Sequence, residues 1–224
     1  MRQHIIVRTV IACIALCALS FTHGVFAQAV RDVREARHLV EVARLDSSIH
    51  LDIRYATANN FMGRPMYTEA RAFLQGPAAE ALLRAHRALK KLGYGLLVFD
   101  GYRPWSVTKK FWDETPVEKH KFVASPAKGS KHNRGCAVDL SLYDLRTGRE
   151  IAMPSSYDEF SDRAASNYAG GTPEERRTRW LLRSAMVTEG FTIEPSEWWH
   201  YDYRAWAEYP ILDVPFEQLP AQTR

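Results

Sequence analysis

The chain has 224 residues, of which 46% are hydrophobic, 12% aromatic and 25% charged. These are the proportions of a globular protein, and they exclude a disordered chain, a collagen-like repeat and a small disulfide scaffold. The 30 basic residues nearly balance the 26 acidic ones, and no dense run of lysine and arginine occurs, so the sequence does not predict nucleic-acid binding.

Residues 1–27 have the pattern of a secretory signal peptide. Two arginines precede or border the apolar run 9–21, and Val25 and Ala27 occupy the −3 and −1 positions of a cleavage site after Ala27. The run is too short to span the ~30 Å hydrocarbon core of a bilayer comfortably, which argues against a retained anchor. We therefore expect an exported, periplasmic protein whose mature domain, 28–224, keeps no stable membrane anchor.

Cleavage at this site would leave a single cysteine. Cys13 and Cys17 fall within the signal peptide, so only Cys136 remains in the mature domain. An intrachain disulfide is therefore excluded, although an oxidising compartment would permit one. Stability must come from packing, with help from a metal ion if one is bound.

Apolar periodicity predicts strands and helices in mixed order, with no repeat or linker dividing the mature domain. Along the chain we expect an alternating strand at 49–53, a helix at 77–92, a strand at 96–99, a helix at 106–114, a half-buried strand at 138–142, a helix at 173–189 and a strand from Phe191 onward. Residues 30–45 fit either a helix or irregular structure. This order predicts an α+β fold, a compact single domain with helices packed on a largely antiparallel sheet.

Three short segments concentrate the residues suited to chemistry, and the first is the turn 100–104. It follows an apolar strand directly, a place where loops often carry function. Arg103 offers a permanent charge and a rigid fork of donors for an oxyanion or a carboxylate. The alternative is a surface turn in which Arg103 is only solvated.

The second segment runs from Ser130 to Asp139. Gly135 would let the chain turn tightly after His132 into a strand on which Asp139 points away from the apolar face. His132 and Asp139 could therefore meet as a nitrogen and an oxygen ligand, and zinc accepts both donor types. The spacing alone is not a known zinc signature.

The third segment, 197–200, places two tryptophans between Glu197 and His200. In a regular strand, residues three apart point to opposite faces, so a bend, a bulge or a helical turn would be needed to bring these two together. The alternative is a buried aromatic strand, because tryptophan mostly serves packing.

Together these segments resemble the D-alanyl-D-alanine dipeptidases, a family of zinc peptidases. The family pattern is Gly-Tyr-Arg-Pro, then Ser-x-His-x-x-Gly-x-Ala-x-Asp, then Glu-x-Trp-His, which here begin at Gly101, Ser130 and Glu197. The resemblance extends to 52–61 and 93–97, so it covers most of the mature chain in order. It implies a compact α+β domain that hydrolyses a small D,D-dipeptide. Antibiotic resistance, cell-wall peptidoglycan turnover and D-alanine recovery are all open as roles, and the predicted export favours the last two, because an exported enzyme would not easily reach the dipeptide in the cytoplasm.

The resemblance also implies a role for each matching residue. His132, Asp139 and His200 would bind one zinc ion per chain, which activates the attacking water. Glu197 would be the general base, and Arg103 would stabilise the transition state. The residues expected to bind substrate are Tyr55, Asp158 and Ser130, of which Tyr55 and Asp158 would line the pocket for the free amino end.

Two further positions can be compared with the family pattern: one differs from it and one fits it. Lys131 stands where the vancomycin-resistance type has a serine beside the substrate, so its long cation bears on specificity. Cys136 fits a position that needs a small residue, and as a neighbour of Val138 on the apolar face it is not expected to be a fourth ligand.

Two other functions remain open at this point. One is a carboxypeptidase that removes D-alanine from peptidoglycan stem peptides, since related zinc peptidases share the histidine and aspartate pattern. The other is a non-catalytic periplasmic peptide-binding protein, against which Glu197 argues because a binding protein needs no base.

Overall fold

A computed structural model describes residues 28, 31–32, 34–36 and 38–219 of the chain. The expected signal peptide, 1–27, lies outside these residues. Among the helices that are described, none has both the length and the apolar character needed to cross a membrane.

The centre of the molecule is a five-stranded sheet. Its strands lie in the order β2-β4-β5-β7-β6, with β2 parallel to β4 and every other pair antiparallel. The bounds are β2 His50–Leu51, β4 Tyr94–Asp100, β5 Ala137–Asp144, β6 Phe191–Glu194 and β7 Glu197–Tyr203. The expected α+β fold with a largely antiparallel sheet is confirmed.

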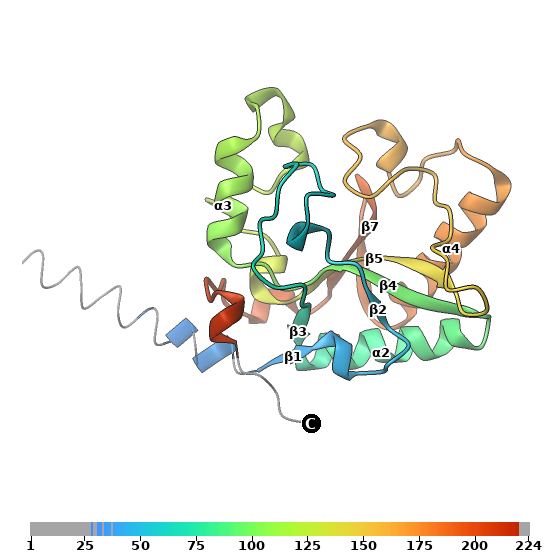
Figure 1. Cartoon of the computed structure of the whole chain (residues 1–224), viewed down its shortest axis with the longest axis horizontal. Coiled ribbons are helices and arrows are strands. Elements are labelled where there is room, and N and C mark those ends of the chain that lie inside the picture. Colours follow the sequence, from blue (N-terminus) through green and yellow to red (C-terminus); the bar gives the residue numbers. More distant parts are fainter. Residues whose placement is uncertain (1–27, 29–30, 33, 37, 220–224) are drawn as a thin grey trace, which may run out of the picture.

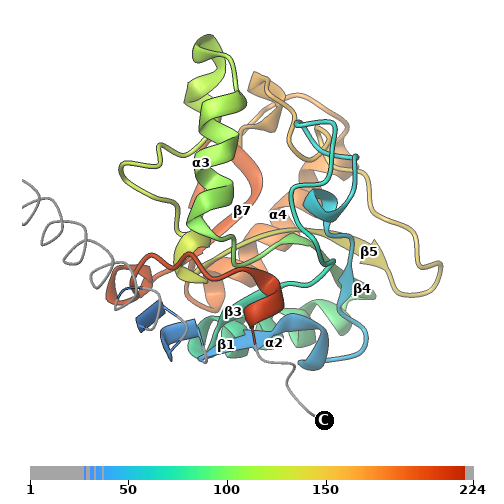
Figure 2. The same ribbon diagram turned by 60° about the vertical axis from the view of Figure 1, so that its left-hand side comes forward.

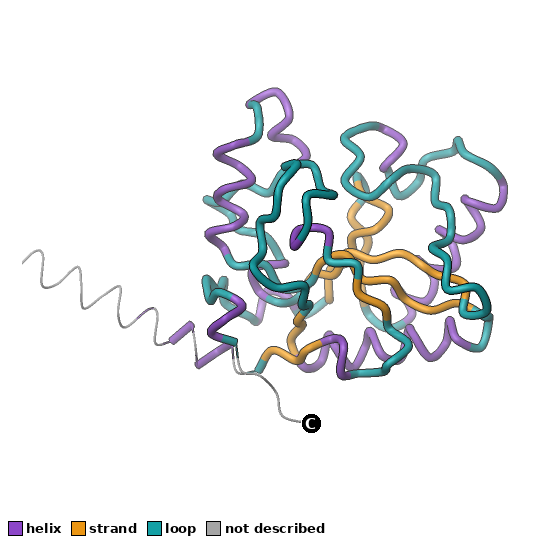
Figure 3. Tube along the Cα trace, in the orientation of Figure 1, coloured by secondary structure: helices purple, strands orange, loops and turns teal. Residues whose placement is uncertain are grey.

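Two helices cover one face of this sheet. Helices α2 (Gly76–Lys90) and α4 (Pro173–Thr188) contact each other, α2 packs on β4, and α4 packs on β5, β6 and β7. Helix α3 (Trp105–Glu114) stands on the other side of the molecule from α2 in both ribbon views (Figures 1 and 2). Much of the chain around α3 is loop (Figure 3). The helices therefore leave one side of the sheet to loops, which is where a binding site has room to form.

The helix boundaries follow from the expected caps. Helix α4 begins at a capping box, in which the Thr172 side chain accepts from the Glu175 amide and the Glu175 side chain accepts from the Thr172 amide. Helix α2 has proline in its first turn, and Gly93 with a φ of 88° lies just beyond its end. The predicted helices at 77–92, 106–114 and 173–189 are confirmed to within two residues at each end.

The central strand β5 differs from its prediction. Every residue of β5 except the last is buried, because β4 and β7 flank the strand and α4 covers one face while loops cover the other. The expectation of a half-buried strand at 138–142 is therefore wrong about exposure. Its alternation still holds: Val138 and Leu140 join the hydrophobic core, whereas Asp139 lines a cavity.

A second, two-stranded sheet braces the loops that carry the chemistry. Strands β1 (Leu39–Glu41) and β3 (Phe73–Gln75) pair antiparallel, and β1 lies within the segment 30–45 that the sequence left open. The amide of Tyr102 donates to Phe73 O over 2.7 Å, and the amide of Gln75 donates to Gly135 O over 2.8 Å. Gly135 has a φ of 66°, and an added Cβ would lie 2.4 Å from a methyl carbon of Leu39, so only glycine fits this turn.

Short 3-10 helices complete the fold, at Val42–Arg44, Arg54–Ala56, Val117–Phe122, His132–Arg134, Asp162–Ala164, Trp206–Glu208 and Phe216–Gln218. The alternating strand expected at 49–53 is shorter than predicted, since only His50–Leu51 pairs with β4 before the chain turns into a 3-10 helix.

Candidate metal centre and active site

Three side chains from distant parts of the sequence converge on one point. His132 lies in a 3-10 helix just before β5, Asp139 lies on β5, and His200 lies opposite Asp139 on β7. The distances are 3.2 Å between His132 Nε2 and His200 Nδ1, 3.0 Å between His200 Nδ1 and Asp139 Oδ1, and 3.3 Å between His132 Nε2 and Asp139 Oδ1. Among the described residues, no other group of histidine, cysteine or acidic side chains is arranged to hold a metal ion.

The spacing of these atoms fits a tetrahedral metal ion. Bonds of ~2.0–2.1 Å at tetrahedral angles place neighbouring ligand atoms about 3.3 Å apart, close to the three observed distances. All three side chains are buried, and three protein ligands leave one position open, as catalytic zinc sites do.

Outer hydrogen bonds orient each ligand. His132 Nδ1 donates to the carbonyl oxygen of Gly101 over 2.7 Å, and His200 Nε2 donates to Asp202 Oδ1 over 2.8 Å. Because these acceptors fix the proton on the outer nitrogen, the inner nitrogen of each ring is available as a ligand. The Tyr157 hydroxyl donates to Asp139 Oδ2 over 3.0 Å, which turns Oδ1 toward the histidines.

The electrostatics of the cluster are dominated by its own members. Burial alone would raise the pKa of Asp139, but His132 and His200 hold it below its usual range. Burial alone would lower the pKa of His200, but the carboxylates of Asp139 and Asp202 raise it well above its usual value. The two carboxylates thus create a negative potential at the His200 ring, which favours positive charge there, either as a proton on the ring or as a bound metal ion.

Glu197 lies beside the cluster, with Oε2 3.8 Å from His200 Nδ1. It is the first residue of β7, and the register with β6 shifts at Ile193 and Glu194. This irregularity lets two residues three apart approach one another, as the sequence required. Burial raises the pKa of Glu197 to about 7, with a further rise from Asp139 and an opposing effect of His200. A carboxyl group with such a pKa can take and release a proton near neutral pH.

The two tryptophans of the segment are buried, so the aromatic-strand interpretation is also correct. Trp198 Nε1 donates to Ser155 Oγ over 2.9 Å. Trp199 lines the cavity and packs edge-on against Tyr157, with ring centroids 5.4 Å apart. The segment 197–200 therefore contributes its two tryptophans to packing and presents Glu197 and His200 to the cavity.

Arg103 is buried, so the interpretation as a solvated surface turn is wrong. Its Nε and Nη2 donate to Asp100 Oδ2 over 3.1 and 2.6 Å. Its guanidinium carbon lies 5.2 Å from the centre of the Tyr55 ring and 4.9 Å from that of Phe111. A cation held this firmly from one side is preorganised to meet negative charge in the cavity.

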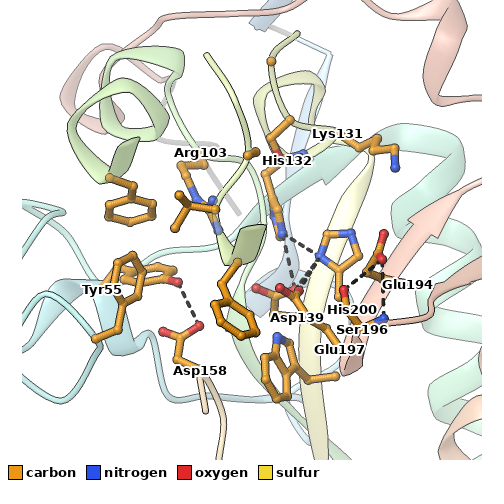
Figure 4. A pocket seen from close by; sticks show the side chains of 18 of the residues that line it. Tyr55, Arg103, Lys131, His132, Asp139, Asp158, Glu194, Ser196, Glu197 and His200 are labelled. Carbon is orange, nitrogen blue, oxygen red and sulfur yellow. Dashed lines mark hydrogen bonds and ion pairs between the residues drawn. The ribbon is translucent and has the colours of Figure 1, made fainter. Parts of the chain in front are cut away.

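These side chains share a cavity of about 430 Å³, whose lining includes Tyr55, Arg103, Ser130, Lys131, His132, Asp139, Asp158, Glu197 and His200. All the residues singled out from the sequence as catalytic, metal-binding or substrate-binding thus line one space. In Figure 4, Tyr55 and Asp158 lie on one side of the two histidines and Lys131 lies on the other.

Asp158 presents an unpaired carboxylate oxygen on its side of the cavity. Oδ1 accepts from the Tyr55 hydroxyl over 3.1 Å, whereas Oδ2 is buried and has no hydrogen-bond partner among the described residues. The residue has a φ of 58°, a left-handed conformation that few side chains adopt without a local reason. Burial and the carboxylates of Asp139 and Glu197 raise the pKa of Asp158 well above its usual value. The position is therefore suited to a cationic partner.

The remaining predicted positions have local partners. Ser130 Oγ accepts from the His132 amide over 3.2 Å and so helps to hold that turn. Lys131 Nζ lies 3.0 Å from Asp202 Oδ2, so its charge is compensated by the carboxylate that orients His200. Cys136 is fully buried and lies outside the metal-ligating group, as expected.

Sequence reasoning missed the outer partners Asp202, Tyr157 and Asp100. Asp202 could have been suspected, since it lies two residues after His200 on the same strand and therefore on the same face. Tyr157 and the role of Asp100 carried no such signal, because their contacts depend on how distant loops fold back on the sheet.

Comparison with known proteins points to one family. Residues 35–217 match the family described as D-ala-D-ala dipeptidase. A D-alanyl-D-alanine dipeptidase of Escherichia coli (strain K12) is 32% identical over 182 residues, covering 81% of this chain and 93% of that protein. One from Enterococcus faecium is 36% identical over 184 residues, 71% of this chain and 90% of its own length. One from Enterococcus faecalis (strain ATCC 700802 / V583) is 35% identical over 193 residues, 77% and 92% of the respective chains.

Proposed function

The chain belongs to the D-alanyl-D-alanine dipeptidase family, and from that premise we propose that it hydrolyses the D-alanyl-D-alanine dipeptide to two molecules of D-alanine with the help of zinc. The observation that carries the proposal is one cavity that holds a three-ligand cluster, Glu197 and the unpaired oxygen of Asp158. Hydrolysis of a free dipeptide needs such a set: a metal site, a proton acceptor and a counter-charge for the substrate's amino end.

His132, Asp139 and His200 are the proposed ligands of one zinc ion per chain. When bound, zinc would supply Lewis acidity toward the peptide carbonyl and lower the pKa of a water molecule toward ~7. Two imidazole nitrogens and one carboxylate oxygen at tetrahedral spacing are a donor set that catalytic zinc accepts.

Glu197 is the proposed general base. Its carboxylate takes a proton from the attacking water and then gives that proton to the nitrogen of the departing D-alanine. The pKa of about 7 supports both steps, because neither proton transfer is then strongly uphill at neutral pH.

Arg103 is the proposed partner of the negative charge that develops on the carbonyl oxygen. Asp100 and the two flanking rings hold the guanidinium in place before substrate arrives. Preorganised donors of this kind act without reorganisation at the moment of reaction.

Asp158 and Tyr55 are the proposed site for the substrate's free ammonium group. The Tyr55 hydroxyl fixes one carboxylate oxygen of Asp158, and the ammonium group would donate to the other, which has no partner. An ammonium ion there would also offset the negative charge of the cavity's carboxylates. Ser130, which holds the turn of His132, stays a predicted lining residue of the substrate site.

The test is a zinc-dependent assay with purified mature protein. We expect about one zinc per chain by elemental analysis, release of D-alanine from D-alanyl-D-alanine, loss of activity with a chelator and recovery with zinc. Glu197→Gln should keep the zinc and lose turnover. A Glu197→Gln protein with near-full activity would refute the base assignment. An intact dipeptide after incubation with the zinc-loaded wild type would overturn the dipeptidase function and leave the carboxypeptidase and peptide-binding alternatives.

Comparison of substrates separates the dipeptidase from the carboxypeptidase alternative. A dipeptidase should turn over D-alanyl-D-alanine far faster than a stem pentapeptide that ends in D-alanyl-D-alanine. The reverse preference would favour the carboxypeptidase.

We propose that the protein is exported, most simply to a periplasm. The support is the signal-peptide pattern of residues 1–27. The N-terminus of the exported protein, determined by mass spectrometry, should be Gln28.

A further inference from the structure

A second cavity, of about 450 Å³, adjoins the first at the end where Asp158 lies. Three residues line both cavities: Phe61, Asp158 and Phe160. Residues that line two neighbouring spaces stand between them, so these three side chains form the boundary.

Two of the three are phenylalanines in contact, and we call Phe61 and Phe160 the aromatic wall. Their ring centroids are 5.1 Å apart with the planes inclined by 41°. Other rings brace the wall from the side of the active site: Phe111 lies 5.1 Å from Phe61, and Phe122 stacks on Phe160 at 4.7 Å. Aromatic contacts at these distances stabilise this arrangement of rings beyond the area they bury.

The wall stands where an N-terminally extended substrate would have to pass. In the proposed function, the ammonium group of a dipeptide ends at Asp158 Oδ2, which belongs to the same boundary. A further residue on the amino side would extend past Asp158, directly against Phe61 and Phe160. The wall therefore lies in the path of any residue that precedes the amino end of the dipeptide.

The space behind the wall is suited to peptide groups. Its lining includes the charged side chains of Glu114 and Lys119, together with Thr115, whose hydroxyl oxygen is buried and has no hydrogen-bond partner among the described residues. An amide or ammonium group that reached this cavity would find an acceptor there, and its volume lies within the range of small-molecule sites.

We propose that the aromatic wall is the specificity determinant that restricts this enzyme to dipeptides, and that opening the wall admits peptides extended at the amino end into the second cavity. This inference rests on the proposed dipeptidase function. It assigns Phe61 and Phe160 a role in choosing the substrate and none in the chemical step.

The experiment measures kcat/KM for two substrates, D-alanyl-D-alanine and glycyl-D-alanyl-D-alanine, on the zinc-loaded enzyme. Phe160→Ala and Phe61→Ala should each raise the ratio of tripeptide to dipeptide kcat/KM at least tenfold over wild type. Phe61→Leu and Phe160→Leu, which lose less packing, should raise it less. Trp206→Ala is the matched control, because Trp206 lines only the first cavity, beside Lys131 and away from the wall, so the ratio should stay within twofold of wild type.

The results distinguish failure of the wall from failure of the function. A wild-type enzyme that leaves the dipeptide intact overturns the proposed function. Wall variants that hydrolyse the dipeptide at a measurable rate but keep the wild-type ratio overturn this inference and leave the function standing. An equal rise of the kcat/KM ratio in Trp206→Ala also overturns the inference, because any enlargement of the first cavity would then be enough to admit the tripeptide.

Discussion

His86 and His200 are both buried histidines with partners at both ring nitrogens, yet the partners differ in charge. His86 Nε2 lies 2.9 Å from Ser48 Oγ, and its Nδ1 accepts from the Leu96 amide over 3.4 Å. His200 Nδ1 lies 3.0 Å from Asp139 Oδ1, and its Nε2 lies 2.8 Å from Asp202 Oδ1. The hydrogen-bond partners of the first ring are a hydroxyl and an amide, with the Asp46 carboxylate farther off at 3.8 Å, whereas two carboxylates within 3.0 Å flank the second.

The difference shows what separates a structural histidine from a candidate ligand. Burial lowers the pKa of His86 to about 4 despite the nearby carboxylate of Asp46, so this ring stays neutral on the buried face of α2. At His200 two carboxylates outweigh burial and raise the pKa. A buried imidazole in a carboxylate-rich cavity with an open side favours a cation, whereas one that bonds to a hydroxyl and an amide completes a core.

The largest effect should come from removing a ring of the cluster. In His200→Ala, two of the three proposed ligands remain, so we expect zinc content to fall well below one per chain and turnover to fall by ~10³-fold or more, because the metal's several kcal/mol of transition-state stabilisation is lost. Elemental analysis and the D-alanine release assay measure both. His86→Gln is the matched control and should keep its zinc and its turnover. An equal loss of zinc and turnover in this control would contradict the assignment of His200 as a ligand and His86 as a structural histidine.

The next effect concerns the buried cation. Arg103→Met should lower kcat by ~10²–10³-fold, the usual result of removing one preorganised donor, while zinc content stays unchanged because Arg103 contacts no proposed ligand atom in the hydrogen-bond pattern. Steady-state kinetics with parallel elemental analysis separate the two quantities. Loss of zinc in this variant would show that Arg103 supports the fold of the site instead.

A smaller effect should follow from neutralising the outer partner of His200. Asp202→Asn keeps the shape but weakens the acceptor for Nε2, so zinc affinity should fall by ~10–100-fold, as is usual for outer partners of metal ligands. Competition with a chelator measures the affinity. Ser48→Ala provides the corresponding change beside His86 and should leave zinc affinity unchanged. Wild-type affinity in Asp202→Asn would contradict the role of Asp202.

The smallest effect on activity belongs to His86, which should instead govern acid stability. The unfolded chain binds a proton on this ring below about pH 6.5, but the folded chain does so only near pH 4. His86 therefore does not reduce the free energy of unfolding above pH 6.5. As the pH falls to 4, this ring lowers the free energy of unfolding by up to about 3 kcal/mol. Urea unfolding at pH 7 and pH 4.5 should show a smaller loss for His86→Gln than for wild type. Equal losses would mean that the ring does not stay neutral.

Local sequence predicted the helices of this protein closely and named the candidate residues that the fold gathers around one cavity. The capping box at Thr172, the proline at the start of α2 and the glycine after it set the helix ends, because caps and left-handed turns depend on neighbouring residues. The candidate residues could be named because their types and order match a known family pattern.

The sequence did not predict the features that depend on contacts between distant segments. The burial of β5 on both faces follows from its central place in the sheet, and the second cavity follows from two loops that bring Phe61 and Phe160 together. The same holds for Tyr157 beside Asp139 and for Lys131 beside Asp202. Sequence by itself determined which groups this protein has available and which local turns present them. Only the tertiary structure decided which of those groups face one another, because distances between residues far apart in the chain are set by packing.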